Sequence, residues 1–229
     1  AVMVAPKNPK HFIKGYDLMD NWKILPTTLR SALPLLIDTH YARRTPSVSY
    51  CFGLYIKDRL EGVVTFGTPP SATLRSGICG GKWASNVLEL SRLVFKNNYK
   101  NSGSYLISRA MKKLPSPSVI VSFADIAQKH TGFVYQATNF FYCGLSANRT
   151  DWAIRGKEHL HGQTIADEFR GVANRSVAMR EKYGKNFYLK PRSRKHRYIF
   201  FIGSKKEKKF MLKDLRYDIL DYPKTNTDI

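Results

Sequence analysis

A short apolar run that ends in an acidic residue and leads into a helical pattern constrains the fold of this chain most. Residues 119–123 are β-branched and aromatic and follow two prolines, which predicts a buried strand ending at Asp125. After a polar turn, apolar residues recur at helical spacing, so that Tyr135 and Asn139 lie one turn apart. The carboxyl end of a strand before a helix is a common place for chemistry in α/β proteins. An ordinary strand end with a packed tyrosine is the alternative interpretation.

A helix is predicted near the N-terminus, after a loose initial segment. Thr27 or Thr28 can cap this helix, and apolar residues follow at helical spacing. Pro34 is expected to kink or split it. At its end, His40 and Tyr41 precede two arginines. This pair either packs as an aromatic beside solvated charges or presents an imidazole and a phenol to a cleft.

The middle of the chain predicts alternating strands and helices. The expected elements are a β-hairpin, an irregular loop, a strand, a polar turn and a helix, over residues 48–66, 67–84, 87–95, 96–104 and 105–114 respectively. A loop as long as the one predicted here is more often a binding loop than filler. The turn before the helix exposes backbone N–H groups that suit a phosphate.

The net charge is the most informative feature of the composition. The chain has 38 Lys and Arg against 17 Asp and Glu, a net charge of +21, which indicates a polyanionic partner. Nucleic acid is favoured over an anionic membrane, since we find neither an amphipathic membrane helix nor a lipidation motif. No apolar run approaches the roughly 20 residues needed to cross a bilayer, and the N-terminal residues do not resemble a signal peptide. An intracellular protein without a membrane partner is therefore expected.

Cysteine and histidine usage argues against common structural metal sites. The three cysteines include no CxxC pair, which disfavours a disulfide framework and a zinc ribbon. His159 and His161 form one HxH pair. A core or DNA-facing role for the pair is favoured over a metal site, because no third ligand is evident.

The last third of the chain is basic and rich in aromatic residues. Basic side chains among aromatics suit a phosphate backbone and unstacked bases, while a solvated basic face is the alternative. We expect residues 1–150 to form a catalytic core and residues 151–229 a DNA-binding extension packed on it, with a further strand over 198–202; whether residues 171–229 fold independently stays open. The candidate DNA-binding residues are Arg175, Arg180, Arg192, Arg194, Lys195 and Arg197.

The order of elements resembles the GNAT acyltransferase superfamily. In that superfamily an acyl-CoA pyrophosphate binds a glycine-containing turn, and a tyrosine of the last core helix often protonates the departing thiolate. Residues 100–105 resemble the turn at Gly103, and residues 135–140 resemble the second motif with Asn139 in place of glycine. The resemblance implies an α/β fold with a mixed central sheet flanked by helices and an acyl-CoA-like donor. The implied donor-binding residues are Lys100, Ser102, Gly103, Ser104 and Asn139.

A more specific resemblance is to the phage Mom family, over roughly residues 25–170. It rests on LELSRLVF at residues 88–95, on VSFAD...H.G.VYQATNF.Y.G at residues 121–144, and on the His-Tyr pair. Mom proteins convert the exocyclic amine of adenine to a methylcarbamoyl (carbamoylmethyl) derivative, which shields phage DNA from host restriction. The family's functional positions fall here on His40, Tyr41, Asp125 and Tyr135.

This resemblance implies a transferase that acts on a base flipped out of double-stranded DNA in the cytoplasm of a phage-infected cell. Asp125 or His40 would accept the amine proton, Tyr135 would donate a proton or orient the donor, and Tyr41 would position the base. The donor stays open between an acyl-CoA-like group and another cofactor, and the His, Tyr and Asp cluster could ligate iron. An N-acetyltransferase of protein or small-molecule amines and a non-enzymatic DNA-binding protein are the alternatives. The oligomeric state, including a homodimer, also stays open.

Overall fold

The computed structural model describes residues 21–39, 47–97, 99–160 and 162–224. The chain divides into two compact units. Residues 1–145 and 195–229 form the first, which we call the core unit, and residues 146–194 form the second, which we call the insert unit. This division differs from the boundary expected at residue 150, because the basic stretch from residue 195 returns to the central sheet.

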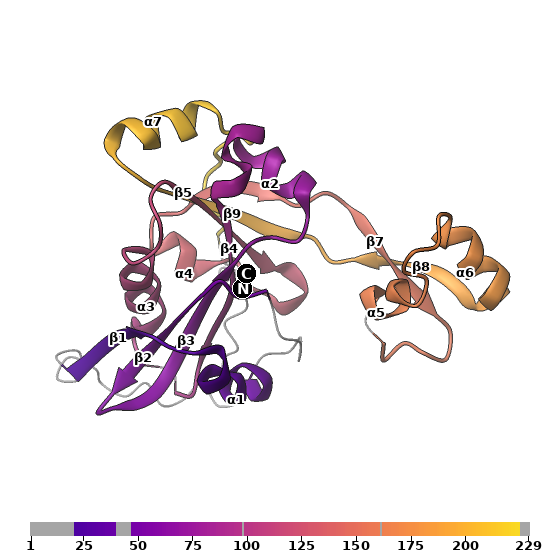
Figure 1. Ribbon diagram of the computed structural model, residues 1–229, viewed down its shortest axis with the longest axis horizontal. Helices are drawn as coiled ribbons and strands as arrows, with labels where there is room; N and C mark the ends of the chain where they lie inside the picture. The colour runs from indigo at the N-terminus through magenta and orange to yellow at the C-terminus, as the bar shows by residue number, and fades with distance from the viewer. Residues whose placement is uncertain (1–20, 40–46, 98, 161, 225–229) are drawn as a thin grey trace. The chain divides into compact units, whose positions relative to one another are not determined.

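The core unit is built on a seven-stranded mixed sheet with the order β1-β2-β3-β4-β5-β9-β6 (Figure 1). The strands are β1 (Trp22–Pro26), β2 (Tyr50–Ile56), β3 (Arg59–Gly67), β4 (Val87–Phe95), β5 (Ser118–Asp125), β6 (Phe141–Leu145) and β9 (Lys195–Ile202). β4 and β5 are parallel, and all other neighbours are antiparallel. β9, the strand expected over residues 198–202, inserts between β5 and β6.

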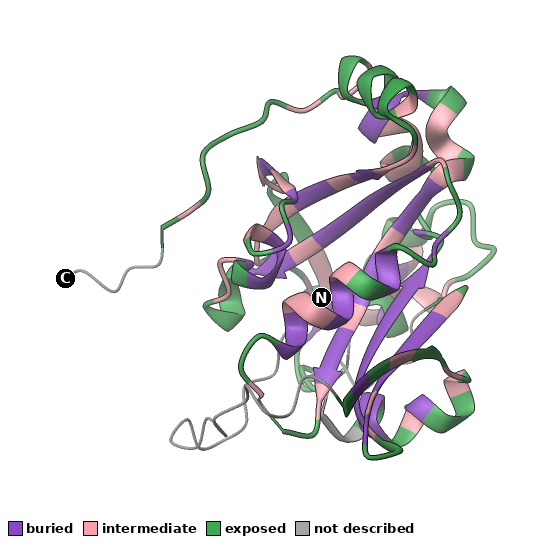
Figure 2. Ribbon diagram, turned by 90° about the vertical axis from the view of Figure 1, so that its left-hand side faces the viewer, coloured by how far each residue is buried: buried purple, intermediate pink, exposed green. Residues whose placement is uncertain are grey.

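Helices cover both faces of this sheet. They are α1 (Leu29–Thr39), α2 (Ala72–Cys79), α3 (Ser102–Met111), α4 (Phe133–Gln136) and α7 (Lys205–Lys213), with short 3-10 turns η2 (Gly81–Asn86) and η3 (Ile126–Gln128). α3 and α4 pack on one face, and α1, α2 and α7 supply buried residues to the other. Figure 2 shows the buried strands between these helices. The predicted mixed sheet flanked by helices is confirmed.

The N-terminal helix and the hairpin illustrate how local sequence sets these elements. Thr28 Oγ1 accepts a hydrogen bond from the Ser31 N–H at 3.1 Å, which confirms Thr28 as a helix cap. α1 continues through Pro34 to its end. Lys57 and Asp58 both have positive φ, 48° and 61°, as a two-residue turn between antiparallel strands requires. β1, which lies in the segment we expected to be loose or to start the helix, was not predicted.

The loop predicted over residues 67–84 is wrong for most of its length. α2 forms there because Ser71 caps its first turn, accepting from the Leu74 N–H at 3.1 Å. Ile78 and Cys79 anchor the helix in the core. The glycines and prolines of this segment are typical of loops, so a helix of only two turns was not predicted.

The insert unit is small and has its own apolar core. It contains β7 (Arg149–Ile154), α5 (Gly162–Asp167), α6 (Arg175–Tyr183), the 3-10 turn η4 (Gly184–Asn186) and β8 (Phe187–Arg192). β7 and β8 form a two-stranded antiparallel ribbon, and Ile154, Ile165 and Met179 are buried beneath it. None of the helices described in either unit is long and apolar enough to cross a membrane.

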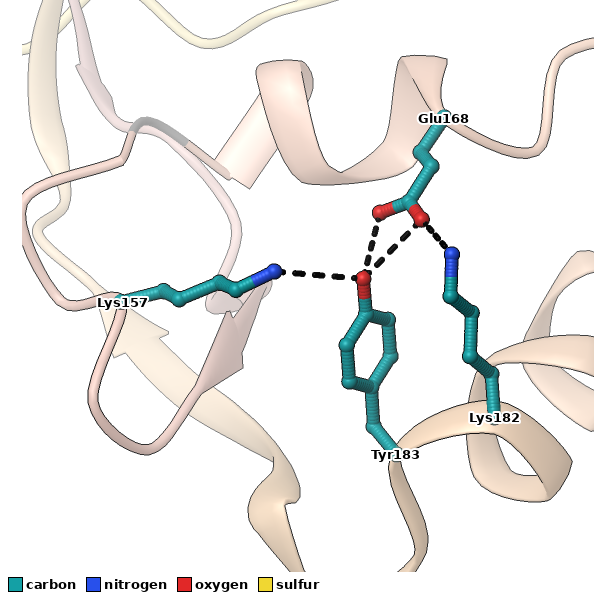
Figure 3. A network of polar contacts seen from close by, with 4 residues as sticks. All are labelled: Lys157, Glu168, Lys182 and Tyr183. Atoms are coloured by element: carbon teal, nitrogen blue, oxygen red, sulfur yellow. Dashed lines mark hydrogen bonds and ion pairs between the residues drawn. The ribbon is translucent and has the colours of Figure 1, made fainter.

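A polar network joins the two helices of the insert unit (Figure 3). The Tyr183 hydroxyl donates to Glu168 Oε2 at 2.7 Å, and Lys182 forms an ion pair with the same carboxylate. The Lys157 ammonium donates to the Tyr183 hydroxyl at 3.4 Å. The hydrogen bond from Lys182 lowers the pKa of the Glu168 carboxyl. The network therefore keeps Glu168 ionised, and its carboxylate is already bonded to Tyr183 and Lys182.

Candidate functional site

The centre of the sheet opens where β4 and β5 separate. The parallel ladder between them runs from Val87 to Glu89 on β4, paired with residues 119–121 of β5. Beyond it, the Ser122 hydroxyl donates to the Leu90 carbonyl at 3.0 Å and so bridges the two strands with a side chain. The described ladder between the two strands has ended by this point, and we call their separation the opening; the carboxyl ends of strands in an α/β sheet are a natural site for chemistry.

Tyr135 lies beside this opening, brought there by α4. Its side chain is 2% exposed and packs against Phe140 and Tyr198, with ring centroids 5.5 and 5.2 Å away. The hydroxyl hydrogen-bonds with Ser122, while burial raises its pKa and the charge of Glu89 adds to that effect. The phenol is therefore protonated at neutral pH and can donate a proton.

Glu89 is a candidate that the sequence interpretation did not single out. It is half-buried in the middle of the sheet, between Gly67 on β3 and Val121 on β5. Its charge contributes to the raised pKa of Tyr135, but its position between Leu88 and Leu90 places its side chain on the opposite face of β4 from the cluster that contains Tyr135. The available signal was one acidic residue in β4, most of whose other residues are apolar. Such a carboxylate can accept a proton from a substrate.

Asp125 ends β5, as predicted, and is 8% exposed. One carboxylate oxygen accepts from the Ala127 N–H at 3.0 Å, and the other lies 3.8 Å from Lys195 Nζ. Because strand side chains alternate, Asp125 points to the opposite face of β5 from Ser122. The structure thus places Asp125 on one face of the sheet and Ser122, the hydrogen-bond partner of Tyr135, on the other. His40 and Tyr41 lie outside the described residues.

Two histidines flank Asp125. Burial lowers the pKa of His130, against the opposing effect of the Asp125 charge. His196 sits on β9 opposite Ala124, and its Nδ1 lies 2.9 Å from the Tyr142 hydroxyl. Burial lowers the pKa of His196 as well. Both imidazoles are therefore neutral at neutral pH.

A pocket of about 660 Å³ opens between α3, the turn after α4 and the start of α7. Of the predicted donor-binding residues, Ser104 and Asn139 line it, and Lys112 and Lys208 add two cations. The first N–H groups of α3 have no acceptor within the helix. The Ser102 N–H bonds to the Tyr99 carbonyl at 3.2 Å, and Lys112 lies at the opposite, C-terminal end of α3. The rest of the first turn of α3 and the two cations of the pocket suit a phosphorylated ligand, so the pocket fits an acyl-CoA-like donor.

The other predicted donor-binding residues do not line this pocket. Ser102 is buried and donates to the Tyr99 carbonyl at 2.8 Å. A Cβ on Gly103 would lie 2.9 Å from a methyl group of Val134, so glycine here permits the close approach of α3 and α4. Lys100 is exposed beside the turn.

The described residues hold no group of three or more His, Cys, Asp or Glu side chains that could bind a metal ion. The expected iron ligand His40 lies outside those residues. The structure therefore gives no donor set through which an iron-dependent step can be derived.

The six predicted DNA-binding residues fall into two groups. Arg175, Arg180 and Arg192 are exposed on the insert unit, with Arg192 Nε also 3.9 Å from Asp151 Oδ2. The other three are engaged internally: Arg194 Nε donates to the Ser146 carbonyl at 2.7 Å, Lys195 pairs with Asp125, and Arg197 donates to the Cys143 carbonyl at 3.2 Å. These contacts make the first group the better candidates for phosphate binding.

Arg149 was not predicted to bind DNA, yet it is the register partner of Arg192 across the insert ribbon. Both arginines are exposed. Like charges directly opposite each other destabilise an antiparallel pair. Asp151 offsets part of this, since its Oδ2 lies 3.9 Å from Arg192 Nε, and an anionic partner would offset the rest. The insert unit has 11 Lys and Arg against 5 Asp and Glu, and Asp151, Asp167 and Glu168 are already in ion pairs.

Comparisons with known proteins agree with the family resemblance. The model of the Mom protein family matches residues 21–224. The methylcarbamoylase Mom of Escherichia phage Mu is 29% identical over 191 residues, which cover 81% of this chain and 76% of the phage Mu protein. The family match spans both the core unit and the insert unit.

Solved structures with a similar arrangement include two acetyltransferases. A GNAT family acetyltransferase from Bacillus cereus ATCC 10987 has a TM-score of 0.41 and 11% identity, covering 79% of this chain and 96% of its own. An N-acetyltransferase from Staphylococcus aureus Mu50 has a TM-score of 0.43 and 13% identity, covering 79% and 98%.

Proposed function

The chain belongs to the Mom protein family, and from this premise we propose that it is a DNA-modifying transferase that adds a carbamoylmethyl-type group to the exocyclic amine of adenine. Its substrate is phage DNA in the infected cell, and the modification protects that DNA from host restriction enzymes. The observation that carries the proposal is the family match over residues 21–224, which a methylcarbamoylase of phage Mu supports at 29% identity.

The chemistry requires one proton acceptor and one proton donor. The amine of adenine is a weak nucleophile inside a base pair, so the base must first leave the stack. A bond then forms between the amine nitrogen and the donor carbon, while the bond from that carbon to its leaving group breaks. The amine loses one proton to Asp125, Glu89 or His40, and the leaving group gains one from the Tyr135 hydroxyl.

The opening between β4 and β5 supports this assignment for Tyr135. A buried phenol that is hydrogen-bonded to Ser122, and whose pKa burial raises, holds its proton until a leaving group develops negative charge. Glu89 lies on the other face of β4 from Leu88 and Leu90, which pack in the same cluster as Tyr135. It can therefore accept the amine proton only on the face of the sheet that Asp125 also faces. Asp125 can do so from the carboxyl end of β5, where Lys195 holds the carboxylate in place.

We assign the donor to the pocket beside α3. An acyl-CoA-like donor would supply an activated carbon and a leaving group. Its phosphates would contact the first turn of α3 around Ser104, and Lys208 and Lys112, the latter at the C-terminal end of α3, would add positive charge along the pocket. Asn139 would contact the donor from the turn after α4.

We assign duplex binding to the insert unit, chiefly to Arg149, Arg175, Arg180 and Arg192. Exposed arginines on a ribbon and a helix suit contacts to phosphates. The tyrosines and phenylalanines beside them are mainly used for packing, since Phe187 and Tyr183 contact the small core of this unit.

Restriction digestion tests the protective function. Plasmid DNA from cells that express the chain should resist restriction enzymes whose sites contain adenine, and plasmid from cells that express Asp125→Asn should be cut. Equal cutting of both plasmids would contradict protection by this protein.

A further inference from the structure

Phe133 is the most exposed large hydrophobic residue among those described, with 73% of its surface accessible. It is the first residue of α4. The next two residues, Val134 and Tyr135, are 8% and 2% exposed. The helix therefore buries Val134 and Tyr135 and exposes the Phe133 ring to solvent.

The segment that carries Phe133 is held firmly, so the exposure is built into the fold. Gly132 has a φ of 80°, and a Cβ there would lie 2.3 Å from the ring of Tyr198. The Thr131 carbonyl accepts hydrogen bonds from the Tyr198 hydroxyl and from Gln136 Nε2. Gly132 itself accepts from the Tyr135 N–H at 2.8 Å. These contacts fix the backbone on both sides of the ring.

The position of Phe133 distinguishes it from other exposed apolar residues, which are common singly on protein surfaces. Residues 126–132 connect it to Asp125, and the His130 N–H bonds back to the Asp125 carbonyl at 3.4 Å. Lys129 is exposed on the same segment. An exposed ring and an exposed cation on the same short segment, which follows directly after Asp125, suit contact with the bases and phosphates of a DNA duplex.

We propose that Phe133 is the wedge that enters the base stack of duplex DNA and fills the space left by the flipped adenine. Proteins that distort DNA commonly insert an apolar side chain between bases, and an enzyme that acts on a base must offset the loss of stacking. Lys129 binds a neighbouring phosphate as the ring enters. This role rests on the proposed function, because it requires an adenine that leaves the duplex.

The test uses the full-length chain and a duplex in which 2-aminopurine replaces an adenine that the wild-type protein modifies in cells. The fluorescence of 2-aminopurine rises when the base leaves the stack. Phe133→Ala should reduce this rise about tenfold at saturating protein, and Phe133→Trp should restore it. Phe210→Ala is the matched control, since Phe210 is 47% exposed among lysines on α7, and it should behave as wild type.

Modification in cells separates this role from the proposed function. If the wild-type chain modifies adenine and Phe133→Ala modifies duplex DNA equally well, the wedge is contradicted and the function stands. If the wild-type chain leaves adenine unmodified, both fail. An undiminished fluorescence rise with Phe133→Ala would also overturn the wedge, whatever its activity in cells.

Discussion

Lys195 and Asp125 are register partners on β9 and β5, and 3.8 Å separates Lys195 Nζ from Asp125 Oδ2. The lysine was predicted to bind DNA, yet the structure uses it to hold a candidate catalytic carboxylate. Both side chains are largely shielded, at 27% and 11% exposed.

We therefore predict that Lys195→Ala lowers adenine modification while duplex affinity stays close to wild type. Loss of the partner should also cost about 1 kcal/mol of folding stability, near the upper end for a partly exposed pair. Urea denaturation, nucleoside analysis and duplex titration measure the three effects. A large loss of duplex affinity with full modification would return Lys195 to the DNA surface.

Tyr135→Phe tests the proton donor. The change removes one buried hydroxyl and its hydrogen bond to Ser122, which should cost about 1 kcal/mol of stability. Modification should fall by roughly 10²-fold or more if the hydroxyl protonates the leaving group. Tyr55→Phe is the control, because it removes a hydroxyl bonded to Thr27 at 3.0 Å outside the site. Equal activity of the two variants would remove Tyr135 from the mechanism.

The arginine pair of the insert ribbon tests duplex binding. Replacing Arg149 and Arg192 together with Gln should weaken binding to any duplex sequence. The slope of log affinity against log salt should become shallower by about 0.9 for each phosphate that the protein no longer neutralises. Replacing Lys57 and Arg59 together with Gln, at the β2–β3 turn of the core unit, controls for the loss of two positive charges. A double variant with the affinity and slope of the control would place the DNA surface elsewhere.

Three buried thiols and a buried phenol predict that the free energy of unfolding falls at alkaline pH. Burial raises the pKa of Cys51 and Cys143 to about 11 and that of Cys79 and Tyr198 to about 12. Above their ordinary values of 9.0 and 10.0, the unfolded chain releases protons that the folded chain retains. Stability contributed by these groups is therefore complete below about pH 9 and is lost as pH rises through the folded values.

Urea midpoints at about pH 8 and about pH 10.5 measure this fall, since that interval begins below the ordinary thiol pKa. The midpoint should be lower at the higher pH. A variant with Ala at all three cysteines should show a smaller fall. The same fall in both proteins would mean that the thiols do not cause it.

Local sequence predicted the centre of the fold well, because buried strands and tight turns leave direct signals. The apolar run of β5 ending at Asp125, the run of β4 and the hairpin of β2 and β3 are found as expected, although Arg59 already belongs to β3. β1 was missed because its few residues directly precede a helix with a stronger pattern. α2 was missed because its glycine and proline surroundings are typical of loops.

Long-range pairing explains the remaining differences. β9 comes from the basic third of the chain and lies between β5 and β6. Its local sequence does not indicate that it pairs with these two strands. Lys195 and Arg197 therefore read as parts of a solvated basic run, although one pairs with Asp125 and the other lies 3.9 Å from the ring centroid of Tyr217. Glu89 was overlooked because its importance depends on where β4 and β5 separate.

Nucleoside mass spectrometry of plasmid DNA tests the central claim most directly. DNA from cells that express the wild-type chain should contain a new adenosine species whose added mass corresponds to a carbamoylmethyl group on the exocyclic amine, and DNA from cells that express Tyr135→Phe should contain little of it. Unmodified adenosine in the wild-type sample, with the folded protein present in the cells, would contradict the account.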